Sequence, residues 1–455
     1  MLGYREYMAD HDPADTTSAG TDRTDREWGF RTRSIHAGNV PDAVTGARAL
    51  PIYQTTAFVF DDTADAAARF ALQKYGNIYS RVANPTVAAF EERVASLEGG
   101  LGAVATSSGL SAQYITFASL AGAGDHIVAS AGLYGGSVTQ LDVTLRRFGV
   151  DTTFIPGTNP EDYAAAITDK TKLIFAESIS NPSGEIADIE GLAEVAHAAG
   201  VPLIIDSTFA TPYLNRPIEW GADVVVHSAT KFLGGHGTTM GGVIVESGKF
   251  NWGNGKFPEF TSPSPGYHGV IFHETFGDFG YTMKARMEIM RTFGPALAPI
   301  NAWLLLQGLE SLHVRMERHC ENTLAVAKFL KEHPRVAWVN YPGLPDNKYF
   351  SLAKKYLPKG ASGLLNFGIK AGKRGGREAG ERFIEAAQFM SHLANIGDAK
   401  TLIIHPASTT HRQMDEADQI KAGVTPDMVR MSVGLETLDD ILWDIDQALM
   451  ESAKC

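Results

Sequence analysis

Between residues 100 and 228 the chain alternates short apolar runs with stretches of helical length, and this alternation constrains the fold more than any other feature. The apolar runs read GAVAT, DHIVAS, KLIFAES, VPLIIDS and ADVVVHS. Most are separated by segments of about 10 to 15 residues with helical character, such as IEGLAEVAHAAG. Alternating strands and helices form βαβ units, whose strands lie parallel beneath helices on both faces. The sequence therefore predicts an α/β fold with a large, mostly parallel sheet.

Length and local composition predict four segments. Because 455 residues exceed one ordinary core, we expect two packed domains. Residues 1–30 are polar and acidic and predict a mobile tail. Residues 31–85 mix turn residues with short extended segments and show no helical period, which predicts an arm that contacts a neighbouring subunit. We place a large cofactor-binding domain at 86–300 and a smaller C-terminal α/β domain at 301–455.

Composition argues against several classes of protein. A formal net charge of -12 disfavours nucleic-acid binding, which needs clustered basic residues. No run approaches the roughly 18 apolar residues that span a bilayer. Two cysteines, Cys320 and Cys455, cannot build a disulfide framework or a zinc site. We therefore expect a cytoplasmic protein without nucleic-acid, membrane or metal partners.

Polar side chains gather where the predicted strands end, which is the edge where open α/β sheets bind ligands. Gly109 and Leu110 open a helix after one strand, so their N–H groups can face a phosphate. The hydroxyls of Ser228 and Thr230 can contact the same phosphate. Taken singly, such a glycine turn is weak evidence, because tight turns need glycine anyway.

Three further groups suit a phosphorylated aromatic aldehyde. Asp206 ends an apolar strand and can pair with a protonated ring nitrogen. Lys231 offers an amine that condenses with an aldehyde, and Tyr134 can stack on the ring. Alone, each has an ordinary explanation as a surface lysine, a turn or capping aspartate, or a core aromatic. Together at strand ends of one αβ series, they predict pyridoxal phosphate as cofactor.

The run DSTFATPYLNRPIEWGADVVVHSATKFLGGHG closely resembles the Cys/Met metabolism family of pyridoxal phosphate enzymes, which share the aspartate aminotransferase-like fold, fold type I. The resemblance extends over residues 34 to 449. It implies that the cofactor-linked lysine is Lys231, that the ring-nitrogen aspartate is Asp206, and that the stacking residue is Tyr134. It also implies that Lys231 moves protons at Cα and Cβ, and that Tyr134 assists the early proton transfer.

Two other motifs carry the same resemblance. The motif YSRVANPT implies that Tyr79 and Arg81 contact the phosphate in a neighbouring subunit, so that a homodimer shares its active sites and pairs into a homotetramer. The segment MVRMSVGLE implies that Arg430 binds the substrate α-carboxylate, and SNP implies that Asn181 lies near cofactor and substrate. From the residues alone, Arg81 and Arg430 are equally explained as surface arginines, and Asn181 as a turn residue.

Details within the family favour one branch. Residues 393–413 and the insert around FPEFTSPSPGYHG resemble the O-acetylhomoserine sulfhydrylase branch. Methionine γ-lyases carry a cysteine after the stacking tyrosine, where this chain reads LYGGS. The resemblance implies replacement of the acetyl ester by sulfide, giving homocysteine and acetate for methionine biosynthesis. Cystathionine γ-synthase, cystathionine γ-lyase and methionine γ-lyase activities stay open alternatives.

Two readings from other classes also stay open. One is a non-catalytic scaffold with the pyridoxal phosphate fold, which would need none of Lys231, Asp206, Tyr134 and Arg430. The other is a nucleotide-binding α/β protein, although the chain lacks a G-x-G-x-x-G fingerprint and a P-loop. The sequence leaves undecided which homoserine ester reacts and whether sulfide, methanethiol or a carrier-bound thiol supplies the sulfur.

Overall fold

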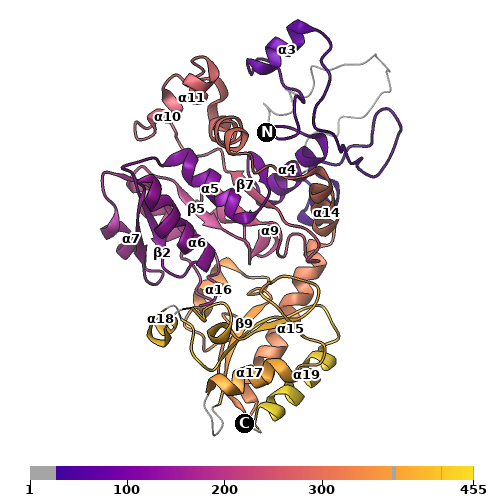
Figure 1. The fold of residues 1–455 in the computed structure, drawn as a ribbon, viewed down its shortest axis with the longest axis vertical. Helices are drawn as coiled ribbons and strands as arrows, with labels where there is room; N and C mark the ends of the chain where they lie inside the picture. Colours follow the sequence, from indigo (N-terminus) through magenta and orange to yellow (C-terminus); the bar gives the residue numbers. More distant parts are fainter. Residues whose placement is uncertain (1–26, 371–375, 414, 422, 454–455) are drawn as a thin grey trace.

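The structure is a computed structural model that describes residues 27–370, 376–413, 415–421 and 423–453. Two sheets organise these residues, and an N-terminal arm projects from them (Figure 1). We call the seven-stranded sheet the large sheet and the five-stranded sheet the small sheet. No helix within the described ranges combines the length and apolar character needed to cross a bilayer.

The large sheet has the strand order β1-β7-β6-β5-β4-β2-β3. Only the two pairings of β7 are antiparallel, so the predicted mostly parallel sheet is confirmed. Sequence patterning does not single out β3, which lies at the sheet edge, or β7, which follows the glycine-rich turn. The strands are β1 (Gly102–Thr106), β2 (His126–Ser130), β3 (Asp151–Ile155), β4 (Thr171–Glu177), β5 (Leu203–Asp206), β6 (Val224–Ser228) and β7 (Gly242–Glu246).

Helices cover both faces of the large sheet (Figure 1). They are α4 (Pro85–Glu98), α5 (Gly109–Leu120), α6 (Gly135–Thr139), α7 (Pro160–Ala166), α8 (Ile189–Ala198), α9 (Thr211–Leu214), α10 (Pro258–Thr261), α11 (Phe272–Phe276), α12 (Gly280–Lys284) and α13 (Arg291–Phe293). Helix α4 begins with a proline after its capping residue Asn84, whose side chain accepts from Thr86 N at 3.0 Å. It ends at Gly99, which takes the left-handed conformation with φ 77°.

The core explains why the central strands are apolar throughout. On β6, Val225 joins the hydrophobic cluster on one face, while Val224 and Val226 join the cluster on the other. On β5, Ile205 and Ile204 divide in the same way. Because both faces are covered, the polar side chains of these strands come late in each strand, and the buried His227 of β6 is paired with Glu98 at 2.6 Å.

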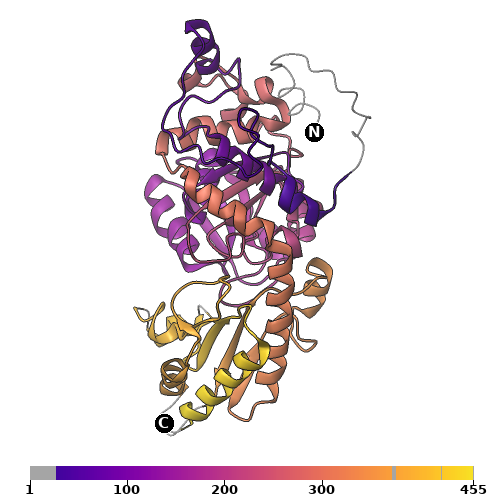
Figure 2. The same cartoon turned by 90° about the vertical axis from the view of Figure 1, so that its right-hand side faces the viewer.

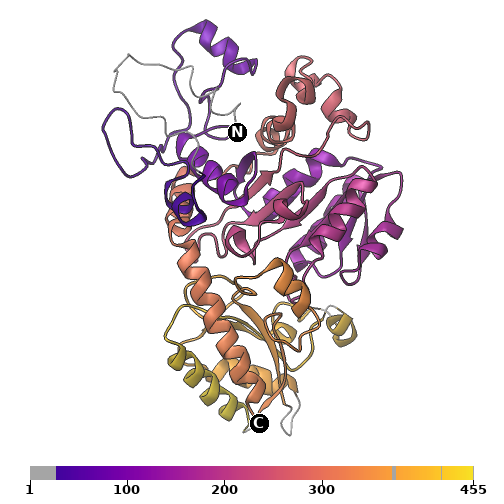
Figure 3. The same cartoon turned by 180° about the vertical axis from the view of Figure 1, so that it is seen from behind.

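The small sheet has the strand order β10-β11-β12-β9-β8. Its strands are β8 (Val336–Asn340), β9 (Leu364–Ile369), β10 (Ser391–His392), β11 (Leu402–Ile404) and β12 (Met428–Ser432). Helix α14 (Pro299–Glu310) packs on α4 beside the large sheet. The helices of the small-sheet half are α15 (Leu312–Glu332), α16 (Phe350–Tyr356), α17 (Gly376–Ala386), α18 (Glu416–Lys421) and α19 (Leu438–Ser452). Figures 2 and 3 show α15 running from the large-sheet half along the small sheet. The domain boundary near residue 300 stays a prediction.

The arm differs from the expectation of a segment without helices. It contains α2 (Phe30–His36) and α3 (Thr63–Phe70). Helix α2 packs on α4 and α14, and at seven residues it is too short to show a helical period in the sequence. Of the predicted mobile tail, residues 1–26 lie outside the described residues, and Phe30 already belongs to α2.

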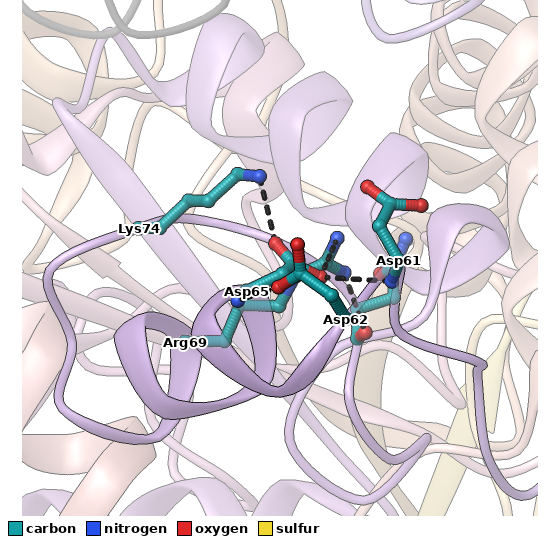
Figure 4. A network of polar contacts seen from close by, with 6 residues as sticks. Asp61, Asp62, Asp65, Arg69 and Lys74 are labelled. Atoms are coloured by element: carbon teal, nitrogen blue, oxygen red, sulfur yellow. Dashed lines mark hydrogen bonds and ion pairs between the residues drawn. The ribbon is translucent and has the colours of Figure 1, made fainter.

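Helix α3 is held by ion pairs at its polar end (Figure 4). The carboxylate of Asp65 is 2.9 Å from Arg69 Nη2 and 2.7 Å from Lys74 Nζ. Asp62 caps the helix by accepting from Asp65 N at 2.7 Å. Arg69 also donates to Asn77 O at 3.1 Å, which fixes the return of the chain toward Tyr79. These polar contacts hold α3 together with the Phe60–Phe70 ring contact, whose centroids are 6.0 Å apart.

Candidate active site

The polar ends of the central strands meet at one edge of the large sheet. Asp206 ends β5 in register with Glu177 at the end of β4, and with Val226 on β6. Two residues after Val226, β6 ends at Ser228, whose N–H donates to Thr208 Oγ1 at 2.8 Å. The strand-end residues that the sequence singles out are therefore brought together, as parallel strand order requires.

Asp206 is 7% exposed and has its carboxylate fixed from two sides. Gln113 Nε2 on α5 donates to Asp206 Oδ2 at 2.9 Å, and Thr208 N donates to Oδ1 at 2.9 Å. Both bonds hold the carboxylate in one orientation at the strand end. This geometry suits a carboxylate that pairs with a single cationic nitrogen.

The start of α5 forms a cradle with the end of β6. Ser108 caps this helix by accepting from Ser111 N at 3.1 Å. A Cβ added at Gly109 would lie 2.6 Å from Ser228 Cβ, so only glycine allows this approach. The N–H groups of a helix start, next to a serine hydroxyl, make an anion site. Leu110, the second residue of α5, lies partly exposed beside the cradle.

Thr230 sits differently from the other hydroxyls predicted to bind phosphate. Its Oγ1 donates to Gly241 O at 3.2 Å and accepts from Gly241 N at 3.1 Å. These contacts fasten the glycine-rich turn after Lys231 to the chain that leads into β7. The Thr230 hydroxyl is therefore hydrogen-bonded to the backbone of Gly241, whereas Ser228 lies against the start of α5.

Lys231 lies one turn beyond β6, and its Nζ donates to Asn395 Oδ1 at 2.5 Å. Burial, together with the positive charge of Arg430, lowers the pKa of Lys231 to about 8. A larger fraction of this amine is therefore neutral near physiological pH than of an ordinary lysine. A neutral amine is the form that attacks a carbonyl or takes up a proton.

Arg430 reaches the same place from the small sheet. It lies in the middle of β12, and its Nη1 donates to Asn181 Oδ1 at 3.1 Å. Burial lowers the pKa of Arg430 to about 10, while Tyr134 acts in the opposite direction. The structure thus brings Arg430 and Asn181 together, with Lys231 and Tyr134 close enough to interact electrostatically.

Tyr134 immediately precedes α6 and is 49% exposed, so its ring is available for stacking. The ring lies over Gly136, where an added Cβ would be 2.4 Å from Tyr134 Cε1. A glycine two residues after the tyrosine is therefore a condition for this ring position.

Glu177 is a member of the site that the sequence interpretation missed. Its Oε1 accepts from Tyr134 N at 2.7 Å and its Oε2 accepts from Asn181 N at 3.2 Å. Burial and the neighbouring Asp206 raise the pKa of Glu177 well above its ordinary value. One buried side chain therefore ties together the two loops that carry Tyr134 and Asn181. Its position at a strand end, in register with Asp206, was the available signal.

Tyr79 and Arg81 are not joined to these groups by any contact recorded for the described chain. Both lie in the arm, where Tyr79 forms an antiparallel bridge with Ala57. The Arg81 guanidinium carbon lies 5.0 Å from the centroid of the Tyr79 ring. Figure 1 shows the arm and α3 extending beyond the large sheet. Their predicted contact with a second subunit stays a prediction.

Comparison with known proteins identifies the family. The model of the Cys/Met metabolism PLP-dependent enzymes matches residues 31–450. The chain belongs to this family. It is therefore an enzyme that uses pyridoxal phosphate, as the sequence predicts, and its fold is the predicted fold type I.

Named members of the Cys/Met metabolism family resemble the chain over nearly its whole length. It is 50% identical to O-acetyl-L-homoserine sulfhydrylase of Leptospira meyeri, over 93% of this chain and 97% of the relative. It is 52% identical to homocysteine synthase of Schizosaccharomyces pombe, over 92% and 98%. A crystal structure of a putative O-acetylhomoserine (thiol)-lyase from Campylobacter jejuni, which carries N'-pyridoxyl-lysine-5'-monophosphate, matches with a TM-score of 0.89 and 40% identity, over 93% of this chain and 100% of that chain.

The residues present fit the family's cofactor. The cradle at Gly109, which a Cβ would fill, suits the phosphate, and the fixed carboxylate of Asp206 suits the ring nitrogen. Lys231 supplies an amine whose pKa is lowered to about 8. The donor set therefore matches a phosphorylated pyridine aldehyde in charge and in chemistry.

Proposed function

We propose that this enzyme replaces the acetyl ester of O-acetylhomoserine with sulfide, giving homocysteine and acetate. The observation that carries the proposal is the approach of Lys231 to Arg430 of the small sheet. Lys231 follows β6, which pairs with the strand that ends at Asp206. One group moves protons, one binds a carboxylate, and one pairs with a ring nitrogen. The sulfhydrylase and homocysteine synthase names of half-identical relatives support this substrate class.

Binding the cofactor is the task of Asp206 and of the cradle at α5 in this proposal. Pyridoxal phosphate, when bound, supplies a protonated ring that withdraws electrons from the substrate Cα. Asp206 keeps the ring nitrogen protonated, while the N–H groups of Gly109 and Leu110 bind the phosphate with Ser228. Thr230 contributes by fastening the turn that carries Lys231. Tyr134 stacks on the ring face and assists the first proton transfer.

Arg430 and Asn181 orient the amino-acid substrate. A guanidinium binds a carboxylate through two parallel hydrogen bonds, which fixes the direction of the Cα–H bond. Because Arg430 already donates to Asn181 Oδ1, the amide holds the guanidinium at the seam of the two sheets. Lys231 then removes protons from Cα and from Cβ. The Cβ–H electrons form a Cβ=Cγ bond as acetate leaves with the electrons of the Cγ–O bond. Hydrosulfide adds at Cγ, and protons return to Cβ and Cα.

The shared active site is a second part of the proposal. Tyr79 and Arg81 of one subunit bind the cofactor phosphate in the other subunit of a homodimer. Two such dimers form a homotetramer. In a single chain the arm exposes apolar side chains to water, since Val59 is 93% exposed and Phe70 is 58% exposed. A second subunit packed on the arm would cover them. Its rigid α3, held by Asp65, suits an element that projects residues into another chain.

Mixing two inactive variants tests the shared site. Lys231→Ala and Arg81→Ala chains, unfolded together and refolded with cofactor, should give mixed dimers in which one site holds both wild-type residues. Activity should return to about a quarter of the wild-type level, because half the dimers are mixed and each has one intact site. Activity no higher than either parent would show that each site is built from one chain.

The reaction itself is tested by acetate release from O-acetylhomoserine with and without sulfide. We expect release to depend on sulfide and homocysteine to appear in equal amount. Succinyl and phospho esters of homoserine, and methanethiol in place of sulfide, define the ester and the sulfur donor. Cystathionine formation from cysteine, or breakdown of methionine, would move the enzyme to another branch of the family.

A further inference from the structure

The contact between Lys231 and Asn395 joins the reactive amine to the half of the protein that binds the substrate carboxylate. Asn395 begins a turn, residues 395–399, that precedes β11 of the small sheet. Its Oδ1 accepts from Lys231 Nζ at 2.5 Å across 164 residues of sequence. We call residues 395–399 the anchoring turn.

The anchoring turn also packs against the backbone that carries Lys231. Gly397 has φ 74°, and a Cβ there would lie 2.6 Å from Phe232 N. Ala399 N donates to Gly235 O at 2.9 Å, beyond the lysine in the glycine-rich turn. From α15, Arg315 Nη1 donates to Phe232 O at 2.7 Å. The segment after Lys231 is therefore held by two elements outside the large sheet, the anchoring turn and α15.

The same turn is bonded to the strand that carries Arg430. Gly397 N donates to Ser432 Oγ at 2.9 Å, and Ser432 follows Arg430 by two residues on β12. Gly434 N donates to Thr401 Oγ1 at 2.9 Å just beyond these residues. Asn395 and Arg430 are thus parts of one bonded unit, in which Ser432 is the link.

We propose that Asn395 is a positioning residue that receives the Lys231 amine whenever it is free of the cofactor, and that Ser432 fixes this position relative to Arg430. The inference rests on the proposed function, since it assigns the geometry of that same site. After Lys231 takes a proton from the substrate Cα, the resulting ammonium donates to Asn395 Oδ1. Strand β12 therefore positions both partners of the proton transfer. Arg430 on this strand binds the substrate, and Ser432 on the same strand holds the turn whose Asn395 orients the Lys231 amine.

The first test is the reactivity of the Lys231 amine in the full-length, cofactor-free protein. Acylation by acetic anhydride, followed by mass spectrometry across pH, gives the pH at which this amine becomes neutral. Arg430 faces the amine, and Tyr134 and His411 in turn face Arg430, so all three stay unchanged in the comparison.

Asn395→Leu keeps the side-chain size but removes the acceptor for the ammonium, so the midpoint pH should fall. Asn395→Asp keeps an acceptor and adds negative charge, so the midpoint should rise. Lys400→Met changes an exposed residue just past the same turn and should leave it unmoved. A Leu variant whose midpoint is unchanged, or rises toward that of an ordinary lysine because the site has opened, would overturn the proposal.

The second test uses the cofactor-loaded enzyme and the exchange of the Cα proton of L-methionine with deuterated water. Asn395→Leu should slow exchange about tenfold at saturation with little change in KM, and Asn395→Asp should recover part of the rate. Ser432→Ala keeps Lys231, Asn395 and Arg430 and should show a smaller loss of the same kind. Equal exchange rates in all three variants would overturn the proposal. Because neither test uses an acyl ester or sulfide, failure of the proposed reaction would remain separately visible.

Discussion

Glu177 and Asp206 lie opposite each other at the ends of two neighbouring parallel strands, so that two acidic side chains share one buried edge. Burial and the charge of Asp206 raise the pKa of Glu177 well above its ordinary value. Two carboxyl groups at one buried edge disfavour a negative charge on both. Glu177 accepts from the backbone N–H groups of Tyr134 and Asn181 in their two loops, while Asp206 accepts from Gln113 and Thr208.

Glu177→Gln should weaken catalysis by loosening those loops. The glutamine amide has one oxygen acceptor where the carboxyl group accepts from two N–H donors, so one buried donor loses its partner at a cost of ~1–3 kcal/mol. We expect kcat/KM to fall about tenfold. Glu190→Gln, at an exposed ion pair with Lys355, is the matched control. Equal kcat/KM in both variants would remove Glu177 from the site.

Lys231→Ala should bind cofactor and lose turnover by several orders of magnitude. Phosphate and ring contacts do not depend on this lysine, whereas proton transfer at Cα does. Equilibrium dialysis measures retained cofactor, and acetate release measures turnover. Partial recovery on adding methylamine is expected, because a small amine can fill the space of the lost side chain. Near-normal activity without added amine would contradict the assignment.

Arg430→Gln should raise the pKa of Lys231 above the value of about 8 that burial and this arginine produce. Removing a nearby cation favours the ammonium form, so the amine becomes neutral only at higher pH. At pH 8 the variant should therefore be acylated more slowly at Lys231 in the cofactor-free protein. A faster reaction, or an unchanged one, would show that Arg430 does not act on this amine.

Gly136→Ala should displace the Tyr134 ring. The added Cβ would lie 2.4 Å from Tyr134 Cε1, so the ring or the start of α6 has to shift. We expect weaker cofactor stacking, seen as a changed visible spectrum and a lower kcat, with little loss of thermal stability because the Tyr134 ring is half exposed. Gly135→Ala, where nothing lies within 4 Å of the new Cβ, is the control. Matching spectra in the two variants would contradict this ring placement.

The strand-end residues were accessible from sequence because of the way parallel sheets are built. Lys231, Asp206 and Ser228 follow apolar runs that could only be buried strands, and consecutive parallel strands deliver their ends to one edge. Residues that follow different parallel strands in the sequence therefore lie close together in the fold. The same reasoning predicts that Glu177, the first residue of ESISNP, lies at this edge. However, a glutamate at the end of a strand is equally explained as a solvent-exposed side chain, so the sequence alone did not single it out.

The role of Asn395 and the presence of helix α2 could not be predicted from the sequence, and the physical cause differs between the two. Asn395 reaches Lys231 across 164 residues, from a turn with no apolar period or charge pattern of its own. Its role depends on how the two sheets meet, which no local pattern encodes. Helix α2 has seven residues and one buried side chain, Ser34, so packing against α4 decides its conformation.

The central claim is replacement at Cγ by sulfide, and the most direct test is the fate of isotopically labelled sulfide. The cofactor-loaded enzyme, given O-acetylhomoserine and ³⁴S-sulfide, should form homocysteine that contains the label, with one acetate released for each homocysteine. Acetate release accompanied by ammonia and an unlabelled 2-oxo acid would show elimination instead, and would contradict the proposed replacement reaction.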